Sequence, residues 1–343
     1  MSINNLTKYS SPYIDVCLWP TYDITSTLKA CGQKYFTLAF VVLGTENKAS
    51  WGGYYPVLSS EWYLDKIIEF RALGGDVIIS FGGANGQELA QGITDISKLV
   101  IEYQSVINTY KVKILDFDIE GGAIADPISI DRRNKALIII KKNNPGLKIH
   151  YTLPVMPYIN KWNLGGLDNN GLNLIKNAKE NGLDIDMLGI MCMDYNSDKK
   201  DMGIAAITAA QATKEQLINI GYTNTLLSLI PMIGVNDTGE IFTLENAKTV
   251  LDFASNNSFI GMLSFWSGNR DIFQNTAQIY ASADKSGIIQ KQNEFTTIFN
   301  KFDKTPQPTP QPQPTPQLLP KFNISLMLDS SGDISSINID SVN

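Results

Sequence analysis

Three carboxylates stand on alternate positions of one short segment, Asp116, Asp118 and Glu120. Side chains of a β-strand alternate between two faces, so these acids are expected to share one face. Carboxylates that are crowded and desolvated cannot all be ionised at neutral pH, and sites of this kind are often catalytic. The other face is large and apolar: Leu115, Phe117 and Ile119.

This spacing predicts a general acid, because at least one of the crowded carboxyls should hold a proton. Glu120 has the longest side chain and lies nearest the following loop, so it is the candidate acid. Asp118 is expected to share or relay the proton, and Asp116 to tune Asp118. The alternatives are a buried ionic network without metal and a solvated edge strand, against which the large apolar neighbours argue.

The rest of the chain predicts a (β/α)8 barrel, an α/β fold in which eight parallel strands alternate with helices. An open, doubly wound sheet is the alternative, although no nucleotide-binding glycine loop is present. Leu99, Tyr103, Val106 and Tyr110 mark one helix face, and Asp95 is its expected N-cap. The expected strands are Tyr13–Leu18, Tyr35–Leu43, Asp76–Ser80, Val112–Ile119, Lys148–Leu153, Met187–Cys192, Leu226–Ile233 and Ile260–Phe265.

A barrel carries its active site at the carboxyl ends of its strands, and aromatic and polar residues gather there in this sequence. Strand four ends at Glu120, strand six leads into the segment 193–196, and strand eight ends at Trp266. The other strand ends that carry such residues are Trp19, Ser80 to Gly83, Pro154 to Met156 and Gly234 to Asp237.

The acidic segment resembles the DxxDxDxE signature of the family 18 glycoside hydrolases, the chitinases. The resemblance implies that Glu120 is the catalytic acid and that Asp118 assists the acetamido group of the substrate, with Asp116 beneath it. Lys113 departs from the signature at its first Asp. In a regular strand position 113 faces away from the three acids, so the departure concerns a supporting interaction.

Further motifs are similar to those of the same family over about residues 12–285. Gly82 and Gly83 belong to an SxGG-like motif, and Met191 to Tyr195 resembles the Met-x-Tyr signature, whose Tyr would hold the acetamido group. Asn196 stands where the family often has Asp, and Trp266 matches the Trp that floors the sugar pocket. The residues expected to bind substrate are Trp266, Met193, Asn196, Gly82, Gly83 and Trp19, with Tyr22, Trp51 and Tyr54 as further candidates.

Composition and single residue types exclude other classes of function. A net charge of −6 without a basic run argues against nucleic-acid binding, and no apolar stretch is long enough to span a membrane. The single His150 lies far from any nucleophile, which argues against a catalytic triad and a zinc site, so no metal and no cofactor are expected. Three cysteines predict buried thiols, with a Cys17–Cys31 bridge as the alternative.

Three segments are expected: a catalytic barrel over 1–300, a Pro/Gln/Thr-rich linker over 301–317 and a short tail over 318–343. The proline density of the linker favours an extended polyproline II spacer. Apolar residues alternate on both sides of a turn-like Ser330 to Asp333 in the tail. This pattern is typical of a hairpin at the start of a β module, and a disordered tail is the alternative.

The resemblance implies a monomeric, retaining, endo-acting hydrolase of β-1,4-linked N-acetylglucosamine polymers, in which the substrate's acetamido group replaces an enzyme nucleophile. Two alternatives share the barrel: an endo-β-N-acetylglucosaminidase acting on glycoproteins, and a non-catalytic chitin-binding lectin. The expected partner is chitin or a chitooligosaccharide. The resemblance also suggests an extracellular protein, although residues 1–11 are polar and lack the apolar core of a signal peptide.

Overall fold

The computed structural model describes residues 8–160, 162–196, 201–302, 321–328 and 334–342. Two compact units divide the chain, residues 1–306 and residues 307–343. The expected linker falls mostly on residues 303–320, which lie outside the described ones. In the described part of the chain no helix is both long and apolar enough to cross a membrane.

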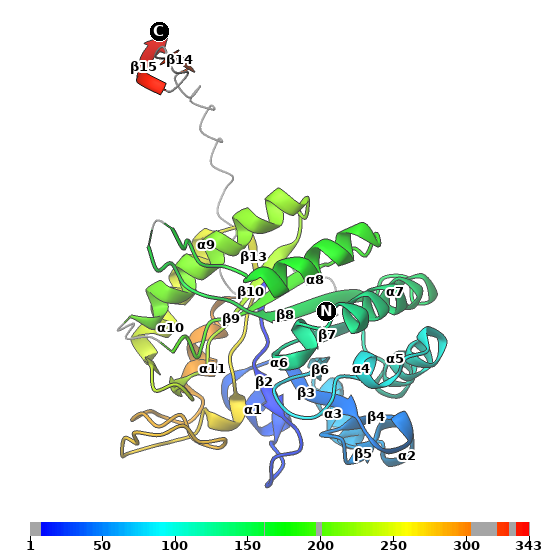
Figure 1. Ribbon diagram of the computed structural model, residues 1–343. Coiled ribbons are helices and arrows are strands. Elements are labelled where there is room, and N and C mark those ends of the chain that lie inside the picture. The colour runs from blue at the N-terminus through cyan, green and yellow to red at the C-terminus, as the bar shows by residue number, and fades with distance from the viewer. Residues whose placement is uncertain (1–7, 161, 197–200, 303–320, 329–333, 343) are drawn as a thin grey trace. The chain divides into compact units, whose positions relative to one another are not determined.

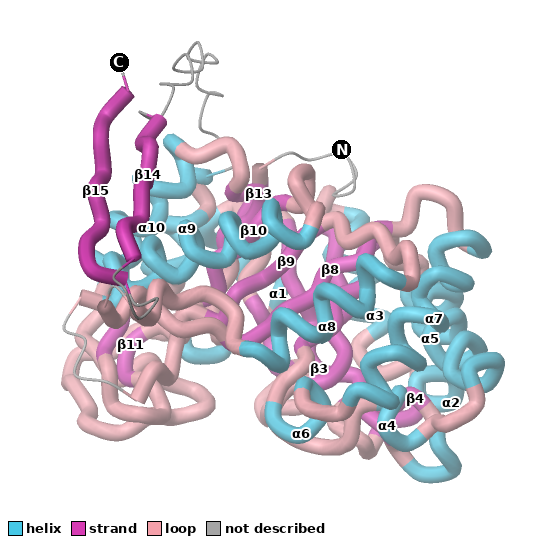
Figure 2. The backbone as a smooth tube through the Cα atoms, turned by 45° about the horizontal axis from the view of Figure 1, so that its top comes forward, coloured by secondary structure: helices cyan, strands magenta, loops and turns pink. Residues whose placement is uncertain are grey.

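The larger unit is a (β/α)8 barrel, with strands at the centre and helices around them (Figures 1 and 2). Neighbouring strands of the ring pair in parallel. The strands are β1 (Tyr9–Ser10) with β2 (Tyr13–Asp15), β3 (Tyr35–Leu43), β6 (Asp76–Gly82), β7 (Ile114–Asp118), β8 (Lys148–Pro154), β9 (Met187–Met191), β10 (Leu226–Ile230) and β13 (Ile260–Leu263). The helices that follow them are α1 (Ile24–Cys31), α3 (Leu64–Ala72), α5 (Ile96–Tyr110), α7 (Pro127–Asn143), α8 (Asn169–Glu180), α9 (Met202–Ile220), α10 (Leu244–Asn256) and α11 (Glu294–Phe299).

The first strand position is split, and this split closes the ring. β1 pairs with β13, whereas β2 pairs with β3. Between them, the Ser11 amide donates to the Leu263 carbonyl (2.9 Å) and the Thr37 amide donates to the Pro12 carbonyl (2.9 Å). The predicted first strand, Tyr13–Leu18, was therefore placed too late, because Tyr9 and Ser10 already pair.

Short strands and single-turn helices lie in the loops that follow the barrel strands. The hairpin strands β4 (Ala49–Trp51) and β5 (Tyr55–Pro56) extend β3, and β11 (Gly234–Val235) pairs with β12 (Ile241–Phe242). Three single-turn helices, α2 (Val57–Ser60), α4 (Leu89–Gly92) and α6 (Gly121–Ile124), lie in the loops after β3, β6 and β7. Two 3-10 turns are η2 (Thr45–Asn47) and η3 (Gly268–Arg270).

The helix boundaries follow from local chemistry. The Asp95 side chain accepts a hydrogen bond from the Lys98 amide (2.9 Å) and caps α5, as predicted. The helix ends where Lys111 adopts a left-handed backbone, with φ of 53°.

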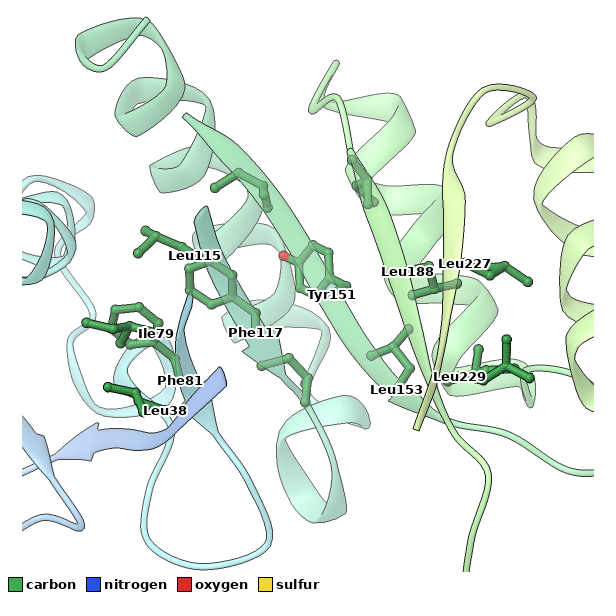
Figure 3. Packing of buried hydrophobic residues seen from close by; sticks show 14 of the residues in the cluster. Leu38, Ile79, Phe81, Leu115, Phe117, Tyr151, Leu153, Leu188, Leu227 and Leu229 are labelled. Atoms are coloured by element: carbon green, nitrogen blue, oxygen red, sulfur yellow. The ribbon is translucent and has the colours of Figure 1, made fainter. Parts of the chain in front are cut away.

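The main apolar core lies between the strands and the helices (Figure 3). Phe81 on β6 and Phe117 on β7 stack with ring centroids 5.0 Å apart, and Tyr103 of α5 meets both rings edge-on. Aromatic pairs of this geometry add to the free energy gained from burial alone. The apolar face of the acidic strand is thus fixed against its helix.

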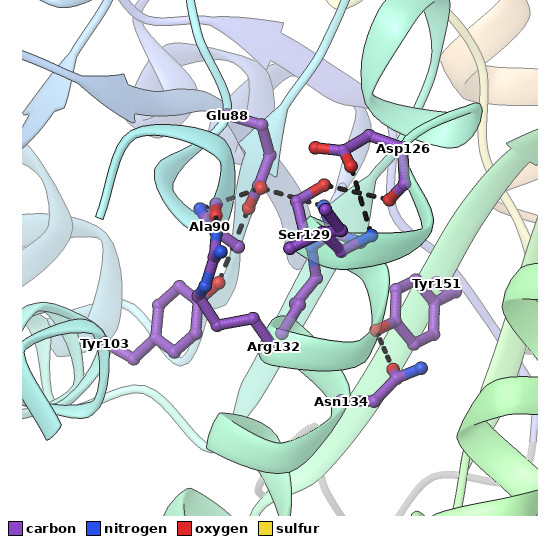
Figure 4. Close-up of polar contacts among 10 residues, drawn as sticks. Glu88, Ala90, Tyr103, Asp126, Ser129, Arg132, Asn134 and Tyr151 are labelled. Atoms are coloured by element: carbon purple, nitrogen blue, oxygen red, sulfur yellow. Dashed lines mark hydrogen bonds and ion pairs between the residues drawn. The ribbon is translucent and has the colours of Figure 1, made fainter. Parts of the chain in front are cut away.

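A buried ion pair fastens the loop after β6 to α7 (Figure 4). The Arg133 guanidinium donates from Nη2 to Glu88 Oε2 (2.8 Å), and the same oxygen accepts from the Ala90 amide (2.8 Å). The Tyr103 hydroxyl donates to the other oxygen of Glu88 at 3.4 Å. The two charged side chains are 0% and 3% exposed, so each depends on the other for compensation.

All three cysteines carry free thiols, but the expected burial holds only for Cys192, because Cys17 and Cys31 are partly exposed. The expected alternative of a Cys17–Cys31 bridge is not formed, because the Cys31 thiol donates to the Thr27 carbonyl (3.2 Å) and Cys17 carries a free thiol. His150 is buried on β8, and this burial lowers its pKa to about 3, so the imidazole is neutral.

The smaller unit contains an antiparallel pair, β14 (Lys321–Leu328) and β15 (Ile334–Val342). Ile324 lies opposite Ile339, and Leu326 opposite Ile337. The predicted hairpin is confirmed in its two strands, while the expected turn falls on residues 329–333, outside the described ones.

Replacing Arg133 with Met is expected to lower the free energy of unfolding by about 3–5 kcal/mol, because Glu88 would remain as an uncompensated buried charge. Adding Glu88→Gln should recover most of this loss. The neighbouring Arg132→Met, which removes a partly solvated arginine, is the control and should cost about 1 kcal/mol or less. Urea denaturation measures all three, and a double variant no more stable than Arg133→Met would contradict the expectation.

Candidate active site

The acidic strand β7 alternates as predicted. Asp116 and Asp118 are buried on its inner face, 2% and 5% exposed, whereas the residues between them belong to the outer core. Glu120 follows the strand with an extended backbone, half-buried, where α6 begins. All three carboxyls therefore rise along one face toward the carboxyl end of the barrel.

Asp116 is held by hydroxyl groups from three other strands. Oδ2 accepts from the Tyr13 hydroxyl (2.7 Å) and from Ser80 Oγ (2.6 Å), and Oδ1 accepts from Thr152 Oγ1 (2.9 Å). Burial raises the pKa of Asp116, and these three donors act against that rise because they stabilise the ionised form.

In the described part of the chain Asp118, in contrast to Asp116, is not stabilised by hydroxyl donors. Its Oδ1 is buried and has no hydrogen-bond partner among the described residues. Burial raises its pKa well above the ordinary value, and the charges of Glu120 and then Asp116 raise it further. The proton expected in the acidic row therefore resides most stably on Asp118, directly beneath the candidate acid.

Glu120 is influenced by a fourth carboxylate that sequence reasoning missed. Burial raises the pKa of Glu120, and the charge of Asp194, in the loop after β9, raises it further. Asp194 has a left-handed backbone, with φ of 51°. Its amide donates to Asn236 Oδ1 (3.2 Å), and its Oδ1 accepts from the Thr238 amide (3.2 Å).

The structure does not bring Tyr195 to the carboxylates. Its ring is buried in the outer core, and its hydroxyl has a pKa raised by burial and then by Cys192 and Glu240. The role of Tyr195 in holding an acetamido group stays a prediction, and Asp194 is the residue of this loop whose charge acts on Glu120. Asn196 is exposed, with φ of 48°, and immediately precedes residues outside the described part of the chain.

An aromatic cluster stands beside the acidic row. Trp266 stacks on Phe40 with centroids 5.5 Å apart and meets Tyr13 edge-on at 6.3 Å. Met193 packs in the same inner cluster. Trp266 and Met193 are thus brought together as predicted residues of one site, and Tyr13 links them to Asp116 through its hydroxyl. The sequence does not predict Phe40 as a site residue, because it is one of many apolar residues in β3.

Gly82 and Gly83 allow close approach of the backbone, and their contact with substrate stays a prediction. A Cβ on Gly82 would lie 2.0 Å from the Asp118 carbonyl oxygen, and φ at Gly82 is +93°. The Gly83 amide donates to that carbonyl (3.0 Å), and a Cβ there would lie 2.6 Å from the Phe40 ring. Both glycines therefore set the position of Asp118 and Phe40.

The outlying aromatic candidates differ in exposure. Trp19 is 83% exposed and lines a surface hollow of about 540 Å³ with Trp62 and Tyr63. Neither the three acids of the β7 segment nor Asp194 belongs to that lining. Tyr54 is also exposed, at 82%. Trp51 is fully buried and donates from Nε1 to Tyr110 (2.7 Å), so its expected contact with sugar is wrong.

Comparisons with known proteins point in one direction, although no family model matches the chain. It is 34% identical to the catalytic domain of a hyperthermophilic chitinase from Pyrococcus furiosus, with a TM-score of 0.78 over 87% of this chain and 96% of that domain. A GH18 chitinase from Pseudoalteromonas aurantia shares the fold, with a TM-score of 0.54 and 15% identity over 76% of this chain and 94% of its own.

Two curated relatives are each 32% identical to this chain. One is a probable bifunctional chitinase/lysozyme from Escherichia coli, matched over 86% of this chain, and the other is endochitinase 11 from Metarhizium anisopliae, matched over 76%. The chain spans 34% and 52% of the lengths of these two proteins.

A (β/α)8 barrel supports many chemistries at the carboxyl ends of its strands, so the relatives decide which family this one belongs to. The catalytic domain from Pyrococcus furiosus is covered almost completely at 34% identity. The chain therefore belongs to the family 18 glycoside hydrolases, the chitinases.

Replacing Asp118 with Asn is expected to raise the free energy of unfolding at pH 7 by roughly 1–3 kcal/mol. The pKa of Asp118 is higher in the folded than in the unfolded chain, so the wild type loses stability as the pH rises from the unfolded pKa toward the folded one. The gain should thus vanish near pH 3, where both states are protonated. Urea denaturation at the two pH values measures it.

Asp116→Asn is the matched control, because it places an amide among three hydroxyl donors and should lower stability at pH 7. Equal effects of the two substitutions at pH 7 would contradict the assignment of the proton to Asp118.

Proposed function

We propose that this barrel hydrolyses chitin, a polymer of β-1,4-linked N-acetylglucosamine, within the chain and with retention of anomeric configuration. The observation that carries the proposal is Glu120, a half-buried carboxyl whose pKa is raised, standing above Asp118, whose buried Oδ1 has no hydrogen-bond partner among the described residues. The similar proteins support the substrate class: they are described as chitinases, and one Pyrococcus furiosus variant as complexed with chito-oligosaccharides.

In the first step Glu120 donates its proton to the glycosidic oxygen, and the bond from that oxygen to the anomeric carbon breaks. The acetamido oxygen of the same sugar attacks the anomeric carbon from the opposite face and forms an oxazolinium ion. As positive charge develops, the proton of Asp118 passes to Asp116, and it returns to Asp118 in the second step. In between, the Asp118 carboxylate faces the acetamido N–H. Asp116, held by three hydroxyls, keeps its place beneath Asp118.

In the second step Glu120, now a carboxylate, removes a proton from water, and the water oxygen opens the oxazolinium ring. Two inversions at the anomeric carbon give net retention. Asp194 favours this cycle because its charge raises the pKa of Glu120, so Glu120 is protonated at the start of each turnover. Trp266 offers its ring face to the sugar beside the acid, backed by Phe40.

Replacing Glu120 with Gln is expected to lower kcat on a fluorogenic chitooligosaccharide by about 10²–10⁴-fold, because the amide cannot donate the proton. Binding of chitin oligomers, measured by calorimetry, should persist. Unchanged turnover in Glu120→Gln would exclude Glu120 as the acid. A wild type that binds oligomers without turnover would instead support the lectin alternative.

The substrate is tested by comparing colloidal chitin with a high-mannose glycoprotein. We expect soluble oligosaccharides from chitin and no released glycan from the glycoprotein, whereas the reverse result would support the endo-β-N-acetylglucosaminidase alternative. A rapid fall in viscosity of a soluble chitin derivative tests attack within the chain. Proton NMR of the first product formed tests retention, since a β-anomer is expected.

Replacing Trp266 with Ala is expected to raise KM by about tenfold, because the sugar loses an aromatic face worth roughly 1.5 kcal/mol. Trp266→Phe is the matched control and should lie between Ala and wild type. A fall in kcat without a change in KM for Trp266→Ala would assign the ring to positioning of the acid rather than to sugar binding.

A further inference from the structure

Arg270 is an arginine that sequence reasoning did not single out, buried in the wall of the site. It lies in the turn η3, four residues after Trp266, and is 1% exposed. Its guanidinium joins two separate loops: Nη2 donates to the carbonyls of Ile233 (2.9 Å) and Val235 (2.6 Å), and Nη1 donates to the carbonyl of Ser282 (2.5 Å). The planar guanidinium can donate to several carbonyls in fixed directions at once, which the single ammonium of a lysine cannot do.

The loop segment that accepts hydrogen bonds from Arg270 also binds the Asp194 amide. Asn236 follows Val235 directly and donates from Nδ2 to the carbonyls of Met232 (2.8 Å) and Gly234 (3.1 Å). Its Oδ1 accepts from the Asp194 amide (3.2 Å). Hydrogen bonds therefore run from Arg270 through this segment to the residue whose charge acts on Glu120.

The charges around this chain of contacts are mostly negative. Burial lowers the pKa of Arg270 to about 10, and the charges of Asp237, Asp194 and Asp284 act against that fall, so the guanidinium is charged at neutral pH. Asp194 also faces Asp237, and it shares Thr238 with Glu240. Glu120 in turn faces Asp194 and Asp118. Among these groups Arg270 is the cation, and the charge of Asp194 favours its charged form.

We propose that Arg270 is a positioning residue for the catalytic acid: it fixes the loop after β10 so that Asp194 stands opposite Glu120. The catalytic consequence rests on the proposed function, whereas the structural statement does not. Loss of Arg270 frees the loop after β10 and displaces Asp194. A displaced Asp194 acts less strongly on Glu120, so Glu120 releases its proton at lower pH.

The titration of Glu120 tests the inference without substrate. Protein labelled with ¹³C at the glutamate carboxyls is titrated by NMR, and the Glu120 signal is assigned by its loss in Glu120→Gln. We expect a lower midpoint in Arg270→Gln than in wild type, a lower midpoint in Asp194→Asn, and no further change in the double variant. A midpoint that equals wild type in folded Arg270→Gln, or additive changes in the double variant, would overturn the inference.

Arg71→Gln is the matched control, since Arg71 also donates to a backbone carbonyl, that of Tyr110 (2.6 Å), and pairs with Asp76 at the foot of β6. It should change stability and leave the Glu120 midpoint unchanged. If Arg270→Gln does not fold, Arg270→Lys decides: it keeps the charge but not the fork, and we expect a partial fall in the midpoint. A wild-type midpoint in Arg270→Lys would then overturn the proposal.

Kinetics give the second readout. In Arg270→Gln the alkaline limb of the kcat/KM profile on a fluorogenic chitooligosaccharide should move to lower pH, with kcat at the optimum reduced by about 10–100-fold through misplacement. A purely structural role would lower kcat without moving the limb. If the wild type cleaves no chitin, the proposed function is wrong and the NMR test still applies. If the enzyme is active but the alkaline limb of the kcat/KM profile does not move in Arg270→Gln, only this inference is wrong.

Discussion

The structure depends on burying several carboxyls of one strand inside a barrel, and Asp116 shows how that is tolerated. Tyr13, Ser80 and Thr152 come from three other strands and give this carboxylate three hydroxyl donors. The inside of the barrel around it is therefore polar, while the apolar residues of β7 pack outward against α5. Stability is supplied mainly by the outer layer, which leaves the inner layer available for chemistry.

Asp118 gains no comparable compensation, so its pKa is raised well above the ordinary value, whereas three hydroxyl donors oppose the rise at Asp116. A hydroxyl donor beside Asp118 would stabilise the protein and would also stabilise the ionised form of Asp118. A neighbouring loop acts in the same direction: Asp194, held by the loop after β10, adds a charge that raises the pKa of Glu120. The site thus trades folding free energy for protons placed at defined atoms.

Much of this could be predicted from residue patterns. The alternation of acids with Leu115, Phe117 and Ile119 defines β7 and its two faces, because a period of two is unambiguous in a strand. The eight apolar runs define the barrel, and the position of Trp266 at the end of the eighth places it in the site. Each of these inferences uses only local periodicity and the geometry of parallel strands.

What could not be predicted depends on contacts between distant loops. Asp194 faces Glu120 because its backbone turns left-handed and is bound by Asn236 and Thr238, more than forty residues away. The same turn sends Tyr195 into the outer core, so a strand-like alternation fails there. Phe40 and Arg270 carry no local signal, since an apolar strand residue and an arginine after a turn have many ordinary roles.

The divided first strand has a consequence for how the protein is made. The seam of the ring joins residues that are 253 positions apart, as in the bond from Ser264 to the Ser11 carbonyl. A nascent chain leaving the ribosome has its first strand long before the partner that completes the cylinder. Until synthesis reaches that point, two open sheet edges are present, and they need shielding from other chains.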